Sequence, residues 1–145
     1  MARVKLEIPD KVIAKLEIPV RITDINYGNH LGNDALVSLL HEARVMWLRK
    51  YGYTEFNIEG NSVIMSDLAV QYLSESFYGD TLMIELSIGE ISTAGFELYY
   101  FIYRENDKGK QTIAKAKTGI VFYNYALKKI NLIPVAFKAL LMKAY

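Results

Sequence analysis

The sequence predicts an α+β domain in which an antiparallel β-sheet wraps around one long central helix. A single long stretch has helical periodicity, and the chain after it reads mainly as strands joined by turns. Eleven Tyr and six Phe residues add to this, because aromatic residues favour sheets. With 145 residues, of which 52% are hydrophobic, the chain has the size and the apolar content of one domain. We therefore expect residues 1–145 to form a single domain.

The predicted helix runs from Ala35 to Tyr51. Its apolar residues recur at helical spacing and would anchor it in the core: Leu36, Leu39, Leu40, Ala43, Met46 and Trp47. Asn33 or Asp34 is expected to cap it by accepting the first free backbone N–H groups. The polar stretch from Thr23 to Asp34 reads as a loop that ends at the positive end of the helix dipole. Such a place suits a polarised carbonyl group.

Strand patterns follow the helix after a connector at Gly52 to Asn61. The predicted strands are Ser62 to Leu73, Thr81 to Ile88, Phe96 to Arg104 and Thr112 to Tyr123. Leu82, Ile84, Leu86 and Ile88 alternate with Met83, Glu85 and Ser87, which predicts one buried face. Asn106 to Lys110 contains the Asp and Gly of a hairpin turn. Val135 to Lys143, after Pro134, reads as a short C-terminal helix.

The N-terminal part repeats the pentapeptide Lys-Leu-Glu-Ile-Pro at residues 5–9 and 15–19. We interpret this as a chance recurrence or as a hairpin-like extension, because one repeat is too short for a solenoid. The charges near Met1 do not fit a signal peptide, and no apolar run reaches the roughly 18 residues of a membrane span. We expect a cytoplasmic protein that binds no membrane.

Charge and composition exclude further classes of function. The net charge of +1 gives no reason to expect a nucleic-acid partner. The chain has no Cys, which rules out disulfides and a thiol nucleophile. Its two His residues are too few for a three-histidine zinc site. We expect neither a metal nor a cofactor.

Several short motifs stand in a fixed order between Val20 and Phe122. They are Asp24-Ile25-Asn26, His30, Gly32-Asn33, Glu42-Ala43-Arg44, Trp47-Leu48, Tyr72-Leu73 and Tyr78-Gly79-Asp80. In order and spacing they resemble the acyl-CoA thioesterases of the hot dog fold. The closest branch is the 4-hydroxybenzoyl-CoA thioesterase-like one, with the related acyl-carrier-protein thioesterases. The resemblance implies a sheet curled around the helix, thioester hydrolysis, and homodimers or dimers of dimers with sites at the subunit interface.

One position departs from the pattern of these thioesterases. The resemblance places their catalytic carboxylate at Asn26, and a carboxamide cannot act as a general base. Asn26 can still orient a water or hydrogen-bond the thioester. His30 is the nearby group suited to proton transfer near neutral pH, unless it only ties the loop to backbone carbonyls. Asp24 would share a face with Asn26 in an extended segment and serve as the base, or it braces the loop by bonding backbone N–H groups.

The resemblance also implies the residues that bind the substrate. In this family backbone N–H groups near the helix start hold the thioester oxygen, which points to Tyr27, Gly28, Asn29, Leu31, Gly32 and Asn33. Ser66 and Asp67 are further candidates that would line the pocket across the dimer. Four lysines near the last hairpin either meet the phosphates of coenzyme A or form a solvated strand face: Lys108, Lys110, Lys115 and Lys117.

An open sheet edge and an apolar sheet face need cover, which predicts a homo-oligomer. Tyr99, Phe101 and Tyr103 alternate on one face and either belong to that contact or pack as an ordinary sheet. We expect a thioesterase for a small or medium acyl-CoA or acyl-carrier-protein substrate. The alternative is a non-catalytic module that binds the same ligands. An enoyl-CoA hydratase fits less well, because His30 comes one residue too late for that motif and its Pro is missing.

Overall fold

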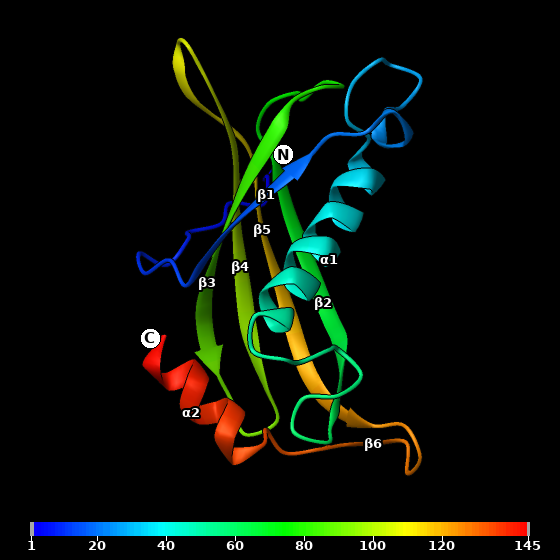
Figure 1. Ribbon diagram of the computed structural model, residues 1–145, viewed down its shortest axis with the longest axis vertical. Coiled ribbons are helices and arrows are strands. Elements are labelled where there is room, and N and C mark those ends of the chain that lie inside the picture. Colours follow the sequence, from blue (N-terminus) through cyan, green and yellow to red (C-terminus); the bar gives the residue numbers. More distant parts are fainter. Residues whose placement is uncertain (1, 145) are drawn as a thin grey trace.

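A computed structural model describes residues 2–144 as one six-stranded antiparallel sheet with a long helix, α1 (Asn33–Arg49), lying across one face (Figure 1). The strands are β1 (Ala14–Pro19), β2 (Ser62–Tyr72), β3 (Thr81–Ile91), β4 (Gly95–Asn106), β5 (Gly109–Asn124) and β6 (Lys129–Ile130). The sheet order is β1-β3-β4-β5-β2, with β6 beside β5. A single-turn helix, η1 (Ile22–Asp24), precedes α1, and α2 (Val135–Lys143) follows the sheet. The predicted fold, a sheet wrapped around a central helix, is confirmed.

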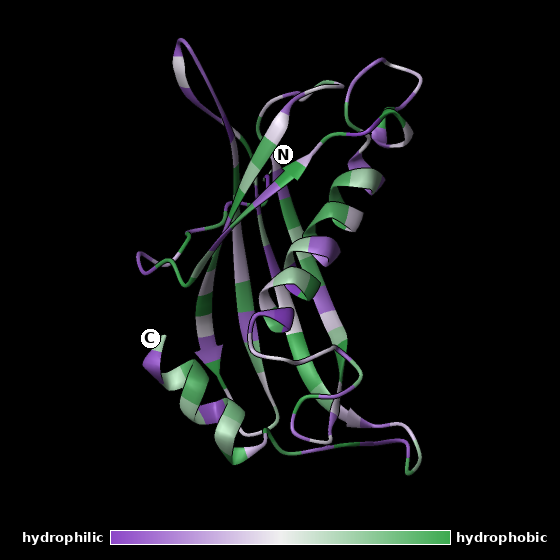
Figure 2. Ribbon diagram, viewed as in Figure 1, coloured by the Kyte–Doolittle hydropathy of each residue, from purple (hydrophilic) through white to green (hydrophobic). Residues whose placement is uncertain are grey.

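The core lies between α1 and the sheet. Leu36, Leu39, Leu40, Ala43 and Trp47 are all buried against it, as the helical spacing predicts, while Met46 is only partly buried. Figure 2 shows the apolar residues of α1 interrupted by hydrophilic ones along its length. The burial of this apolar stripe fixes the start of α1 relative to the sheet.

The four strand predictions are confirmed in place, and their ends shift by up to three residues. Leu82, Ile84, Leu86 and Ile88 are buried, and β4 and β5 form the predicted hairpin across Asp107 and Lys108. β3, β4 and β5 are longer than predicted, and the polar ends of β4 and β5 pair beyond the core, whereas β2 ends one residue earlier, at Tyr72. The hairpin-like N-terminal extension is wrong: residues 15–19 belong to β1, which pairs with β3, and residues 5–9 form no strand.

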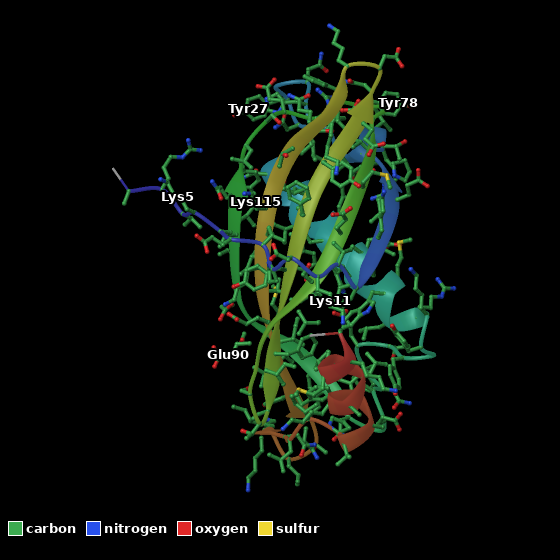
Figure 3. All side chains as sticks on the ribbon, turned by 90° about the vertical axis from the view of Figure 1, so that its left-hand side faces the viewer. Lys5, Lys11, Tyr27, Tyr78, Glu90 and Lys115 are labelled. Carbon is green, nitrogen blue, oxygen red and sulfur yellow. The ribbon has the colours of Figure 1, made fainter. Side chains whose placement is uncertain are left out.

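The N-terminal segment instead crosses the outer face of the sheet, the face opposite α1. Figure 3 shows it passing in front of the strands, with Lys5 toward one side and Lys11 toward the other. The backbone N–H of Leu6 donates to Gln71 Oε1 at 3.0 Å, which ties the segment to β2. Tyr99 and Phe101 on this outer face are partly buried, and Tyr103 is buried.

The edge strand β2 contains a β-bulge at Ser66, between Met65 and Asp67. Gly119 on β5 lies opposite the bulge, where a Cβ would come within 2.7 Å of Ser66 Oγ. The Gly119 N–H donates to Asp67 Oδ1 at 3.0 Å and fixes the irregular backbone. A bulge shifts the alternation of side chains between the two faces, which explains why the sequence pattern of β2 is mixed.

Candidate active site

A pocket of ≈ 440 Å³ lies between the start of α1 and the end of β2. The loop before α1, the first turn of α1 and the segment after β2 form its wall, together with Ile113 of β5. Leu31, Leu36 and Ile113 make part of this wall apolar, and Asn26, His30 and Glu75 bring polar groups to it. A mostly apolar pocket with a few converging polar groups is the usual form of a small-molecule site.

The loop from Asp24 to Gly32 is tied back on itself. Ile25 and Leu31 form a β-bridge, and the N–H of Asn26 donates to the carbonyl of His30 at 2.9 Å. The turn between them needs a left-handed residue, and Asn29 has φ 72°, which Asn tolerates better than most residues. The closed loop therefore holds the side chains of residues 26 and 30 on one side.

Asn26 and His30 meet beside Gly28. Asn26 Oδ1 accepts the Gly28 N–H at 2.9 Å and the His30 N–H at 3.5 Å. A Cβ at Gly28 would lie 3.1 Å from Asn26 Oδ1 and 3.2 Å from His30 Nε2, so a glycine leaves room for both side chains. His30 Nδ1 lies 3.4 Å from the Leu31 carbonyl, a long hydrogen bond that places the ring's other nitrogen, Nε2, toward the pocket side of the loop.

The first turn of α1 presents backbone N–H groups without side-chain caps. The predicted caps are wrong: Gly32 is the N-cap residue, and Asn33 and Asp34 are already helical. Gly32 donates its own N–H to the Asp24 carbonyl, and a Cβ there would lie 2.7 Å from Asp34 Oδ1. Gly32 has no side chain that could cap the helix start, so the first N–H groups of α1 stay available to an oxygen in the pocket.

Tyr72 closes the pocket from the side of β2. Its hydroxyl donates to the Asn33 carbonyl at 2.9 Å and so joins the end of β2 to the first turn of α1. Burial, and then the charge of Asp34, raises the pKa of Tyr72. The hydroxyl therefore keeps its proton and its hydrogen bond across the neutral pH range.

The segment after β2 brings a carboxylate to the pocket. Glu75 lines the pocket, and its Oε1 lies 3.8 Å from His30 Nε2. The next residue, Ser76, accepts the Leu31 N–H at 2.7 Å through its carbonyl and donates its hydroxyl to Asp80 Oδ2 at 2.8 Å. Glu75 is thus held beside the loop by its neighbour in the chain.

Asp80 organises this segment. Its Oδ2 also accepts the Phe77 N–H at 2.8 Å and pairs with Arg104 Nη1 at 2.5 Å. Burial alone would raise the pKa of Asp80, but the hydrogen bonds from Phe77 and Ser76 and the guanidinium of Arg104 lower it. The ionised carboxylate of Asp80 is therefore a positioning group for Ser76 and Glu75.

The structure brings only part of the predicted site together. Asn26, His30, Leu31, Gly32 and Asn33 line the pocket. The remaining predicted residues, which do not line it within the described chain, are Asp24, Tyr27, Gly28, Asn29, Ser66 and Asp67. Gly28 and Asn29 shape the loop through its backbone, and Tyr27 is fully exposed.

Asp24 lies in η1 and not in an extended segment, so its side chain does not share a face with Asn26. Its carboxylate is buried and accepts hydrogen bonds from the backbone N–H and the guanidinium of Arg21. This geometry matches the bracing role. Asp67, in turn, pairs with Lys117 at 2.8 Å on the outer face, so that lysine is already engaged.

Sequence reasoning missed Glu75 and the positions of Tyr72 and Asp80 in the site. Tyr72 and the Tyr78-Gly79-Asp80 motif carried part of the resemblance, but nothing in the spacing showed that they meet the helix start. Within residues 2–144, no three His, Asp or Glu side chains are grouped in a way that would hold a metal ion. No helix in that part of the chain is long and apolar enough to cross a bilayer.

Comparison with known families decides what kind of protein carries this pocket. Residues 20–141 match the thioesterase-like superfamily. The chain belongs to this superfamily. The match includes the loop, α1 and all the residues that line the pocket, so the site lies inside the region shared with the superfamily. A comparison with curated protein sequences gives no significant match.

Solved structures show the same fold as this superfamily member. A 1,4-dihydroxy-2-naphthoyl-CoA thioesterase from Synechocystis has a TM-score of 0.79 at 20% identity, over 88% of this chain and 94% of that one. The 4-hydroxybenzoyl-CoA thioesterase from Pseudomonas sp. strain CBS-3 has a TM-score of 0.77 at 16% identity, over 88% and 97%. A thioesterase superfamily protein from Jannaschia sp. CCS1 has a TM-score of 0.82 at 18% identity, over 94% and 85%. The hot dog fold is therefore established.

Proposed function

We propose that this protein hydrolyses the thioester bond of a small to medium acyl-CoA in the pocket at the start of α1. The main support for this proposal is that three chemical features lie together at this pocket. They are the uncapped N–H groups of α1, the imidazole of His30 and the carboxylate of Glu75. The membership in the thioesterase-like superfamily supports the reaction class.

The uncapped N–H groups polarise the thioester carbonyl. As water adds to the carbonyl carbon, negative charge develops on the oxygen, and preorganised N–H donors at a helix start stabilise it. Collapse of this intermediate breaks the C–S bond and releases the acid and the thiolate of coenzyme A. Removing one such donor in other enzymes costs about 10²- to 10³-fold in rate.

His30 acts as the general base in place of the missing aspartate. With its Nδ1 proton directed to the Leu31 carbonyl, its Nε2 lone pair takes a proton from the attacking water. The resulting imidazolium is stabilised by Glu75, whose Oε1 lies 3.8 Å from Nε2. The imidazolium then returns the proton to the leaving thiolate. Asn26 is fixed by the backbone at Gly28 and orients the water or the thioester with its free amide group.

A second copy of the chain is part of the proposal. Within residues 2–144, β2 pairs with β5 alone, so the other edge of β2 is open. Pairing of two β2 edges would satisfy the free backbone N–H and C=O groups of this edge, and it would bring Ser66 and Asp67 into the subunit interface. We place this homo-oligomer in the cytoplasm, as the sequence predicts, with either coenzyme A or a carrier protein bearing the acyl group.

Turnover of acyl-CoA substrates tests the function directly. Purified protein is given a panel of acyl-CoAs together with a thiol-reactive dye, and the absence of Cys means that the signal comes only from released coenzyme A. Glu75→Gln should lower kcat by up to about fivefold, since the imidazolium loses its counter-charge and an exposed ion pair contributes about 0.2–1 kcal/mol. Glu59→Gln, on a distant connector, is the matched control and should leave turnover unchanged.

The alternative, a non-catalytic acyl-CoA binding module, is favoured by one observation. Asn26 stands where the resemblance places the catalytic acid, and a module that lost turnover would keep the pocket. Calorimetry that finds binding of several acyl-CoAs without any release of coenzyme A would establish the module and refute the enzyme.

A further inference from the structure

A second pocket lies between α1 and β2, farther along the helix and away from the reacting groups. Its volume is ≈ 150 Å³. Val37, Leu40, Met65 and Leu68 give it apolar walls, and Arg44 and Thr118 give it a polar end. We call the strip between α1 and β2 that holds both pockets the α1–β2 groove.

The two pockets follow one another along this groove. α1 and β2 run in opposite directions: Tyr72 meets Asn33 at one end, and Met65 shares the second pocket with Arg44 at the other. At 1.5 Å per residue, Asn33 and Arg44 are separated by about 16 Å along the helix axis. Long helical side chains lean toward the N-terminus, which brings the guanidinium of Arg44 somewhat closer to the thioester site.

The bulge at Ser66 creates the apolar wall of the second pocket. In a regular strand Met65 and Leu68 would point to opposite faces, because side chains alternate. The extra residue turns both toward α1, where they pair with Ile120 and Thr118 of β5. Met65 and Leu68 remain 45% and 38% exposed, so they are available to a ligand in the groove.

Arg44 has one unused donor group at the end of this pocket. It is only 7% exposed; its Nε donates to Glu55 at 2.6 Å and its Nη1 to the Tyr100 hydroxyl at 3.0 Å. Within residues 2–144, Nη2 makes no hydrogen bond. The fully buried side-chain polar atoms without a hydrogen-bond partner in this part of the chain are Trp47 Nε1 and Ser87 Oγ. Arg44 Nη2 is not one of them, so it is accessible to solvent.

The other partners of Arg44 are fixed in place. The Tyr100 hydroxyl is 2.7 Å from Thr118 Oγ1, and Glu55 also bonds His41 at 2.5 Å. Burial alone would raise the pKa of Glu55, but Arg44 and then His41 lower it. Glu55 is therefore ionised and balances the charge of Arg44, so the pair is neutral as a whole and Nη2 remains a directional, charge-assisted N–H donor at the pocket.

We infer that the acyl chain of the substrate lies along the α1–β2 groove and carries an oxygen at its far end, which accepts a hydrogen bond from Arg44 Nη2. The inference rests on the proposed function and names its substrate class, a medium-chain acyl group with a terminal hydroxyl, oxo or carboxylate oxygen. A plain alkyl chain would remove water from Nη2 without replacing its hydrogen bond, and sites built for a polar group reject analogues that lack it.

Binding of non-hydrolysable thioethers tests this without turnover. S-decyl-CoA and S-(ω-hydroxydecyl)-CoA are compared by calorimetry, with S-(ω-carboxynonyl)-CoA as the arm that separates a carboxylate from a hydroxyl. The unaltered protein should bind at least one oxygenated thioether roughly tenfold or more tightly than S-decyl-CoA. Equal binding of all three, or no binding, would overturn the inference.

Paired variants assign the selectivity to Arg44. Arg44→Met combined with Glu55→Gln removes both members of the ion pair, which avoids an uncompensated buried charge. This variant should bind the three thioethers equally, whereas Glu55→Gln alone keeps the donor and should keep the selectivity. An unchanged preference in the folded double variant would refute the role of Arg44.

A blocked groove provides a measurement that leaves the ion pair intact. Val37→Trp should abolish binding of the decyl compounds but retain S-ethyl-CoA, and Val37→Ala is the matched control that should retain all of them. If the unaltered protein hydrolyses no acyl-CoA but still prefers the oxygenated thioethers, the proposed hydrolysis is refuted and the inference about Arg44 stands. Retention of decyl binding by folded Val37→Trp would refute the placement of the acyl chain.

Discussion

Replacing Asn26 by Asp should raise the rate of thioester hydrolysis. Asn26 Oδ1 accepts the N–H groups of Gly28 and His30 at 2.9 and 3.5 Å. An aspartate has the same size, so one carboxylate oxygen keeps these bonds. Its second oxygen takes the place of the amide nitrogen, which makes no hydrogen bond within residues 2–144. The substitution therefore adds a base without rebuilding the loop.

The size of the effect follows from the groups already present. A positioned general base contributes about 10²- to 10⁴-fold, and His30 supplies part of this. We expect a gain near the lower end, about 10²-fold in kcat/KM, which corresponds to about 2.7 kcal/mol of activation free energy. The new charge lies near the start of α1, where the helix dipole stabilises an anion by about 0.3–1 kcal/mol, so the free energy of unfolding should change little.

Release of coenzyme A from the best substrate of the acyl-CoA panel measures the effect. Asn29→Asp is the matched control: it adds the same charge to the same loop at an exposed residue with φ 72°, which Asp tolerates. That control should not change the rate. An unchanged or lower rate in folded Asn26→Asp would refute the placement of Asn26 beside the thioester, and an equal gain in Asn29→Asp would show a nonspecific effect of charge.

Three further predictions concern the base, the segment after β2 and the core. His30→Ala should lower kcat by about 10²- to 10⁴-fold, while His41→Ala, which removes an exposed ring from Glu55, should lower it far less; equal losses would contradict the role of His30. Asp80→Asn should cost roughly 1–3 kcal/mol of unfolding free energy at neutral pH, because a half-buried charged acceptor for Arg104 is lost. The pKa of Asp80 is lowered in the folded state, so its stabilisation is present above the unfolded pKa and disappears as pH falls through the folded one. Thermal melts of the unaltered protein and Asp80→Asn should thus converge at acidic pH, and a constant difference would contradict this. Phe137→Ala should cost about 3–5 kcal/mol in denaturant unfolding, because the buried ring of α2 packs against four other aromatic rings, and a loss below 1 kcal/mol would show that α2 is not part of the core.

The sequence predicted the loop before α1, but it did not predict which residue caps the helix. The mixture of Gly, Asn and Asp predicted a loop at the helix start, and the contacts of Asn26 and His30 lie within that loop. The identity of the helix cap did not follow, because Asn33 and Asp34 are both good caps by type. Only the tertiary structure shows that Gly32 is the N-cap residue, tied by its N–H to the Asp24 carbonyl, and that no side chain caps the first N–H groups of α1.

Strand β2 shows the limit of periodicity as a guide. A bulge at Ser66 resets the alternation, so no single template fits the strand and its two faces cannot be assigned from the sequence. The same bulge engages Asp67 with Gly119 and turns Met65 toward α1. The resemblance suggested Ser66 and Asp67 as substrate-binding residues. The pairing of β2 with β5 shows that Ser66 forms the bulge and that Asp67 stabilises it.

The sequence alone determined the order of α1, β2 to β5 and α2, the buried stripe of α1 and the resemblance to hot dog thioesterases, because each of these follows from neighbouring residues. The tertiary structure decided which distant groups share a pocket. It brought Glu75 to His30 and Tyr72 to Asn33, and it placed Arg44 at the far end of the α1–β2 groove. These meetings depend on how the sheet curls around the helix, and that curvature arises from packing across the whole core.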